Sequence, residues 1–111
     1  MTLDIQGGKI AEYKARHDEI WPEVRAALAA AGLTNLSLWA WPHGGRLFYY
    51  AEYVGAAPFE EAMAEYAKAP RIAEWEALMH SYQQQLPGGG GGEGGKSVWW
   101  QPMECVYSSD F

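Results

Sequence analysis

The sequence predicts an α+β fold of the ferredoxin-like βαββαβ type, in which an antiparallel sheet carries helices on one face. Three observations predict it: strand-like segments, helix-like segments, and the order in which they alternate along the 111 residues. The strand-like segments are residues 2–5, 36–41, 47–54 and 97–107. The helix-like segments are residues 9–31 and 58–86, the second of which is interrupted at Pro70. A chain of this length predicts a single domain, here residues 1–111.

The first helical segment carries an apolar stripe. At 100° per residue, one narrow face collects Ile10, Tyr13, His17, Trp21, Val24 and Leu28. Pro22 is expected to bend or split this helix, because its ring clashes with the preceding turn. Gly32 is expected to end it.

Residues 36–41 (LSLWAW) and 47–54 (LFYYAEYV) predict a hairpin. The turn signal between them is residues 42–45 (PHGG), since glycine adopts positive φ without steric cost. A sheet with helices on one side leaves its other face bare, and aromatic side chains there need covering. We therefore expect a homodimer that forms through the sheet.

The second helical segment predicts two helices, because Pro70 stops the first of them. Their apolar faces are marked by Phe59, Met63, Tyr66, Ile72, Trp75, Met79 and Tyr82. Residues 87–96 (PGGGGGEGGK) are expected to form a flexible surface loop, and the absence of a following Lys-Ser or Lys-Thr helix start argues against phosphate binding. Residues 97–107 are expected to be the closing strand, with Pro102 at an edge or a bulge.

Composition and charge exclude several functions. The formal net charge of -6 argues against nucleic acid and anionic membrane surfaces as partners. The single cysteine, Cys105, excludes an intramolecular disulfide and a multi-cysteine zinc site. His17, His43 and His80 lack metal-ligand spacing, so we expect no metal and no cofactor. With no candidate membrane span or signal peptide, we expect a cytoplasmic protein.

His17 is the first candidate for chemistry, since it lies in the apolar stripe one turn from Tyr13 and one turn from Trp21. A neutral imidazole with an ordinary pKa near ~6.5 both accepts and donates protons at physiological pH. Aromatic neighbours on either side suit a flat, partly apolar ligand such as a sugar. The alternative is a hydrogen-bonded core histidine with no chemical role.

Glu52 is a second candidate. It alternates with Phe48, Tyr50 and Val54 along its strand, so it either faces the helices as a buried carboxylate or faces solvent. In the first case it could orient the imidazole of His17.

Residues 12–24 (EYKARHDEIWPEV) resemble the signature of the L-rhamnose mutarotase family: a Tyr, a His four residues later, and then Ile-Trp-Pro-Glu. The resemblance extends over nearly the whole chain apart from the glycine-rich stretch. The further matching positions are Asn35, Leu47, Phe48, Glu52, Trp75, Met79, Glu104 and Tyr107.

The resemblance implies a dimeric α/β barrel and an isomerase that interconverts the α and β anomers of a neutral aldopyranose, with L-rhamnose as first choice. It implies His17 as the catalytic residue, with Tyr13 and Trp75 contacting the sugar. Trp21 and Glu52 complete our expected substrate-binding set. Two positions depart from the family, because Leu36 replaces a substrate-contacting Tyr and Glu76 replaces a second Trp.

Two other classes of function share this fold. The first is a cofactor-free monooxygenase or a haem-degrading enzyme, which a quinone or haem assay would identify. The second is a non-catalytic sugar-binding or dimerisation module, which an assay of anomer exchange would separate from an enzyme.

Overall fold

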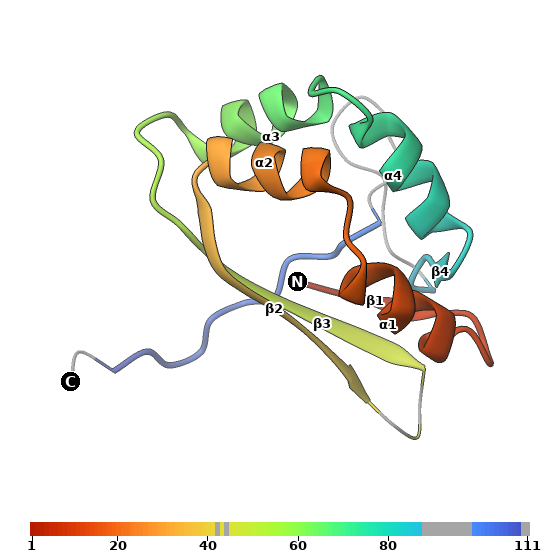
Figure 1. The fold of residues 1–111 in the computed structure, drawn as a ribbon. Helices are drawn as coiled ribbons and strands as arrows, with labels where there is room; N and C mark the ends of the chain where they lie inside the picture. The colour runs from red at the N-terminus through yellow and green to blue at the C-terminus, as the bar shows by residue number, and fades with distance from the viewer. Residues whose placement is uncertain (42, 44, 88–98, 110–111) are drawn as a thin grey trace.

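The computed structural model describes residues 1–41, 43, 45–87 and 99–109. Its elements follow the order βααββααβ (Figure 1). They are β1 (Thr2–Ile5), α1 (Ile10–Asp18), α2 (Pro22–Ala30), β2 (Leu33–Trp41), β3 (Arg46–Tyr53), α3 (Phe59–Ala67), α4 (Ile72–His80) and β4 (Gln83–Gln84). Since α1 with α2 and α3 with α4 each occupy one helical position, this order is βαββαβ.

The four strands form one antiparallel sheet in the order β2-β3-β1-β4, and the helices gather on one side of it (Figure 1). The predicted ferredoxin-like α+β fold is therefore confirmed. Both predicted helix breaks are also present. Pro22 begins α2 as its first residue, where its missing N–H costs no helical hydrogen bond.

The closing strand differs from the prediction. The structure places it at β4, before the glycine-rich stretch, and α4 accordingly ends at His80 instead of residue 86. In the predicted terminal strand, the described residues make only one β-bridge, which joins Gln101 to Thr2. The N–H of each residue donates a hydrogen bond to the C=O of the other, at 2.8 Å in both cases. Pro102 follows directly and has no N–H to donate. Residues 88–96 of the predicted loop lie outside the described residues.

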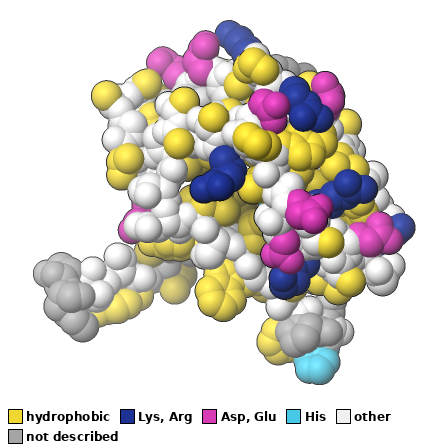
Figure 2. All heavy atoms as spheres, viewed as in Figure 1, with side chains coloured by type: hydrophobic (Ala, Val, Ile, Leu, Met, Phe, Trp, Pro, Cys, Tyr) yellow, Lys and Arg dark blue, Asp and Glu magenta, His cyan; other side chains and the backbone are white. Residues whose placement is uncertain are grey.

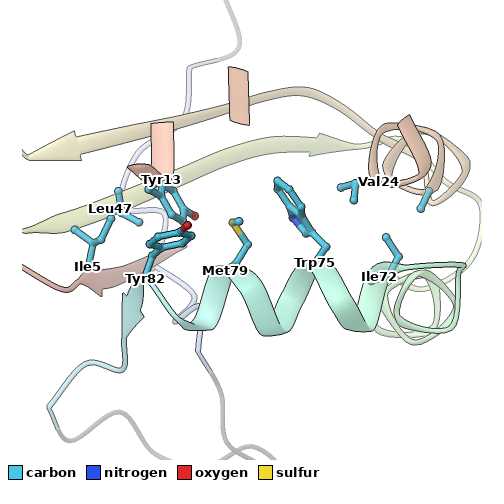
Figure 3. Packing of buried hydrophobic residues seen from close by; sticks show 9 residues of the cluster. Ile5, Tyr13, Val24, Leu47, Ile72, Trp75, Met79 and Tyr82 are labelled. Atoms are coloured by element: carbon cyan, nitrogen blue, oxygen red, sulfur yellow. The ribbon is translucent and has the colours of Figure 1, made fainter. Parts of the chain in front are cut away.

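The core lies between the sheet and the helices. Leu3, Leu47 and Ile72 are almost fully buried. Figure 3 shows Trp75 and Met79 pointing from α4 toward the strands, with Tyr82 beside them just after the helix. Gly32 follows α2 with φ of 90°, and a Cβ there would lie 3.0 Å from the backbone nitrogen of Gly55, so glycine is required at this crossing.

The outward face of the sheet is aromatic. Register pairs Trp39 with Phe48 and Ser37 with Tyr50 on this face. The side chains of Trp39, Trp41 and Tyr50 remain 66%, 57% and 55% exposed. On the helical layer, by contrast, acidic and basic side chains are interspersed (Figure 2). None of the helices among the described residues combines the length and apolar character that crossing a bilayer needs.

Candidate active site

A cavity of about 280 Å³ opens between the helical layer and the inner face of the sheet. Its walls are mostly aliphatic and aromatic, which suits the apolar faces of a small ligand. Its polar side chains are Tyr13, His17, Tyr49, Tyr66, Glu76 and Gln83. They come from α1, β3, α3, α4 and β4, so the fold assembles this polar set from five separate elements. Among the described residues, His, Cys, Asp and Glu do not gather in groups of three that could hold a metal ion.

His17 stands in the cavity wall on the last turn of α1. Its Nδ1 atom lies 2.8 Å from the carbonyl oxygen of Tyr13, one turn earlier. A carbonyl oxygen only accepts hydrogen bonds, so Nδ1 carries the proton in this contact. In the neutral ring, Nε2 is therefore the nitrogen with the free lone pair. Burial lowers the pKa of His17 below its ordinary value, although the bond to Tyr13 acts in the opposite direction.

Tyr13 and Trp75 flank this imidazole. The ring centroids of Tyr13 and His17 lie 4.5 Å apart, and those of His17 and Trp75 lie 5.4 Å apart with an edge-to-face geometry. Both aromatic side chains are at least nine-tenths buried and line the cavity. Burial raises the pKa of Tyr13 to about 12, so its hydroxyl keeps its proton near neutral pH.

Trp21 lies one layer further out and does not line this cavity. Its ring packs edge-to-face on Trp75 with 5.2 Å between centroids, and the Arg71 guanidinium sits 3.9 Å from its ring centroid. The structure thus brings Trp21 to the back of Trp75 and away from direct contact with a ligand in the cavity.

Glu52 is not brought to His17. It is exposed on β3, on the outward side of the sheet, where it accepts hydrogen bonds from Asn35 and from the Tyr50 hydroxyl at 3.3 Å. The solvent-facing alternative therefore holds for this carboxylate. The ring nitrogen of His17 is oriented by the Tyr13 carbonyl instead.

A second hollow of about 530 Å³ lies between α1 and β2. Tyr13, His17 and Leu36 border both this hollow and the inner cavity. The imidazole of His17 therefore stands between an inner cavity and an outer groove.

Comparisons with known proteins identify the family of this chain. A sequence model described as L-rhamnose mutarotase matches residues 1–109. The chain belongs to the L-rhamnose mutarotase family. It is 38% identical to the L-rhamnose mutarotase of Agrobacterium fabrum over 77% of this chain and 76% of that protein. It is 40% identical to the L-fucose mutarotase of Xanthomonas campestris over 84% of this chain and 74% of that protein.

A solved structure shows the same fold. The L-rhamnose mutarotase of Formosa agariphila superimposes with a TM-score of 0.67 at 20% sequence identity, over 97% of this chain and 94% of that chain. Together with the family match, these relatives confirm the predicted function class, a sugar mutarotase and hence an isomerase.

Both departures from the mutarotase pattern, Leu36 and Glu76, lie in the cavity wall. The Glu76 carboxylate is within hydrogen-bonding reach of the Tyr66 hydroxyl, and its Oε2 atom lies 3.9 Å from Nε2 of His80. Burial raises the pKa of Glu76, and the contact with Tyr66 offsets part of that rise. This mutarotase therefore has a carboxylate in its cavity where the family resemblance leads one to expect an indole.

Tyr49 and Gln83 are two members of the cavity wall that were not predicted from the sequence. Tyr49 follows the buried Leu47 by two residues, and strand alternation could have placed it on the inner face. Glu76 follows Ile72 by four residues and so shares the inner face of α4. Gln83 gave no such signal, because its burial depends on a two-residue strand.

Proposed function

We propose that this chain interconverts the α and β anomers of a neutral aldopyranose, with L-rhamnose as the first choice and His17 as the proton-transfer residue. One observation carries the proposal: the Nδ1 atom of His17 is engaged by the Tyr13 carbonyl, which leaves Nε2 as a free base in the wall of an apolar cavity. The lowered pKa of His17 keeps that base neutral near pH 7.

The reaction begins when Nε2 takes the proton of the anomeric hydroxyl. The electron pair of that O–H bond forms a C=O bond at C1, the bond from C1 to the ring oxygen breaks, and the ring oxygen is protonated. Because both oxygens are bonded to C1, one imidazole can pass the proton from the first to the second. Rotation about the C1–C2 bond turns the other face of the aldehyde to the chain hydroxyl, and the reverse steps close the ring. The proton count is unchanged, and carbon is neither oxidised nor reduced.

The neighbouring side chains have distinct roles in this proposal. The protonated hydroxyl of Tyr13 donates a hydrogen bond to the sugar, at the ring oxygen or at a ring hydroxyl. Trp75 offers its ring to the C–H face of the sugar. Trp21 acts as a positioning residue, since its contact with Trp75 fixes the angle of that ring. Mutants of Tyr13 and Trp75 should change sugar affinity more than those of Trp21.

L-rhamnose as the substrate is supported by the family and by the mostly apolar wall, which can accept the methyl group of a 6-deoxy sugar. The test is saturation-transfer NMR of anomer exchange with L-rhamnose, L-fucose, glucose and galactose. We expect the largest catalysed rate with L-rhamnose. Equal rates with glucose or galactose would reject that substrate but keep the mutarotase activity, whereas binding without exchange would favour a non-catalytic sugar-binding module.

We further propose a homodimer in which two copies pack through the outward face of the sheet. The exposed aromatic rings of Trp39, Trp41 and Tyr50 support this arrangement, because large rings in one patch favour burial against a partner. The cytoplasm is the proposed location, and the exposed, unpaired thiol of Cys105 supports a reducing compartment. Cell fractionation with an antibody against the chain tests the location.

A further inference from the structure

Among the described residues, Gln83 is the one buried side chain that is neither aliphatic nor aromatic nor Met, with 3% of its surface exposed. It lies in β4, at the edge of the sheet next to β1. Its Nε2 atom donates a hydrogen bond to the Tyr13 hydroxyl at 3.1 Å. Its backbone carbonyl accepts a bond from Nε2 of Gln6 at 3.2 Å. The strand and the two hydrogen bonds hold this residue in place.

The other end of the same amide has no partner. Among the described residues, the Oε1 atom of Gln83 is the buried side-chain oxygen or nitrogen without a hydrogen bond. Exchanging the two amide atoms would leave the nitrogen unpartnered instead, so one amide atom is free in either orientation. A buried polar group left unpaired destabilises the fold, because it has lost its hydrogen bonds to water and gained none in return. Native proteins seldom leave such a group without a protein, water or ligand partner.

The free amide atom belongs to a residue of the cavity wall. Gln83 lines the same cavity as His17 and Trp75, and its partner Tyr13 is one turn from the imidazole. A sugar in this cavity would bring several hydroxyl groups and leave each of them in need of a partner. The Oε1 atom is itself covered by neighbouring atoms, so a hydroxyl reaches it only when a side chain of the wall shifts as the sugar binds. An acceptor that stays on its strand can then select one hydroxyl.

We infer that Gln83 is a specificity-determining residue, whose Oε1 atom accepts a hydrogen bond from one ring hydroxyl of the bound sugar while Nε2 orients the Tyr13 hydroxyl. The inference rests on the proposed function, since it assumes that the cavity takes a sugar. It adds to that function a second contact with the sugar, from the residue that bonds the Tyr13 hydroxyl.

The test replaces Gln83 by methionine, which keeps the length of the side chain and removes the amide. Gln84→Met is the matched control, because Gln84 is the exposed neighbour on the same strand. Calorimetry measures the binding of L-rhamnose and of its 2-, 3- and 4-deoxy analogues to each protein. We expect Gln83→Met to bind L-rhamnose about tenfold or more weakly and Gln84→Met to bind it like the unmodified protein.

The deoxy analogues identify the contact. For the analogue that lacks the hydroxyl read by Gln83, the difference in affinity between the unmodified protein and Gln83→Met should be smallest, because only the contribution through Tyr13 is then lost. An equal weakening for every analogue would overturn the inference, since it would mean that Gln83 acts only through Tyr13 or through packing. Unchanged binding of L-rhamnose by Gln83→Met would overturn it as well.

A second measurement needs no variant and so does not depend on the folding of Gln83→Met. In a titration with L-rhamnose followed by ¹⁵N NMR, the side-chain amide signals of Gln83 should shift, while those of the exposed Gln84 and Gln85 should stay in place. A Gln83 signal that does not respond to saturating sugar would overturn the inference. Sugar binding without anomer exchange would instead overturn the proposed function alone, and no binding of any sugar by the unmodified protein would overturn both.

Discussion

The Nδ1 atom of His17 lies 2.8 Å from the carbonyl oxygen of Tyr13, and this distance assigns the two ring nitrogens. With Nδ1 as donor to the carbonyl, Nε2 is the base of the neutral ring. The Tyr13 side chain at the same time contacts the imidazole face and receives the amide of Gln83. One residue therefore fixes the tautomer of the histidine through its backbone and contacts the ligand cavity through its side chain.

Replacing His17 by alanine should abolish catalysed anomer exchange while the protein still folds and binds sugar, because Tyr13 and Trp75 keep the walls in place. Saturation-transfer NMR measures the exchange, and circular dichroism and calorimetry measure folding and binding. His43→Ala is the control, since His43 is exposed in the hairpin turn. If His17 is only a core residue, its loss should cost about 1–3 kcal/mol of stability with activity tracking the folded fraction.

Activity should fall on the acid side as the imidazole of His17 takes up a proton and stops acting as a base. Burial lowers the pKa of His17, so the midpoint of this fall should lie below the ordinary value of 6.5. The same shift makes folded-state stability decrease as the pH drops from 6.5 toward the lowered pKa, because the unfolded chain binds the proton more readily. The pH profile of the exchange rate measures the midpoint. A midpoint at or above 6.5 would contradict the assignment of this limb to His17.

Tyr13→Phe should weaken sugar binding or lower the exchange rate modestly, by about tenfold, and should not abolish the reaction. The ring that contacts the imidazole remains, while the hydroxyl that meets the sugar is lost. The backbone carbonyl also remains, so the tautomer of His17 is unchanged and the acid midpoint of the pH profile should stay where it is. A shifted midpoint would show that the hydroxyl acts on the imidazole directly.

Much of the fold could be predicted because its signals are local. The apolar stripe around His17, the break at Pro22 and the hairpin each follow from spacing or from backbone chemistry within one segment. The closing strand could not be predicted, since Gln83 and Gln84 carry no strand pattern. Their pairing with β1 is a tertiary contact, and the aromatic-rich terminal segment offered a stronger but misleading strand signal.

The residues of the candidate site also fall into those with a signal in the sequence and those placed by tertiary contacts. The pairing of His17 with Tyr13 follows from helical spacing and Trp75 from the family resemblance, whereas Tyr49 and Gln83 enter the cavity from strands whose inner faces only the assembled sheet defines. For Glu52, the sequence pattern alone did not decide which face of the sheet the side chain occupies. Its alternation pattern allows either face of the strand, and only the register with β2 places it on the outward side.

Trp39→Lys should convert the proposed dimer to a monomer, because it places a charge in the outward aromatic patch of the sheet. Ala64→Lys is the control, since Ala64 is exposed on α3 in the helical layer. Analytical ultracentrifugation at micromolar concentration measures the mass of each protein. A 12.3 kDa species for the unmodified chain would reject the dimer, and a dimer that tolerates Trp39→Lys would place the interface elsewhere.

Glu76→Gln should stabilise the protein at neutral pH and have little effect near pH 3.5. Burial raises the pKa of Glu76 above its ordinary value of 4.5, so the folded state resists the loss of this proton. The groups that face the carboxylate are Tyr13, Tyr49, Tyr66 and His80. Burial raises the pKa of each tyrosine and lowers that of His80, so all four are neutral at pH 7 and none compensates the charge.

The pKa of Glu76 is higher in the folded chain than in the unfolded chain, and this difference makes its ionisation destabilising. Below the unfolded pKa the carboxyl is protonated in both states and contributes no difference. As the pH rises through 4.5 and up to the folded pKa, the unfolded chain releases the proton first and gains stability relative to the folded one. Glutamine keeps an acceptor for the Tyr66 hydroxyl and never ionises, so the midpoint of thermal unfolding should rise relative to the unmodified protein between pH 4 and pH 8. Glu74→Gln, exposed on the same helix, should show no such gain, and an equal gain in both variants would mean that net charge, not burial at the cavity, sets the effect.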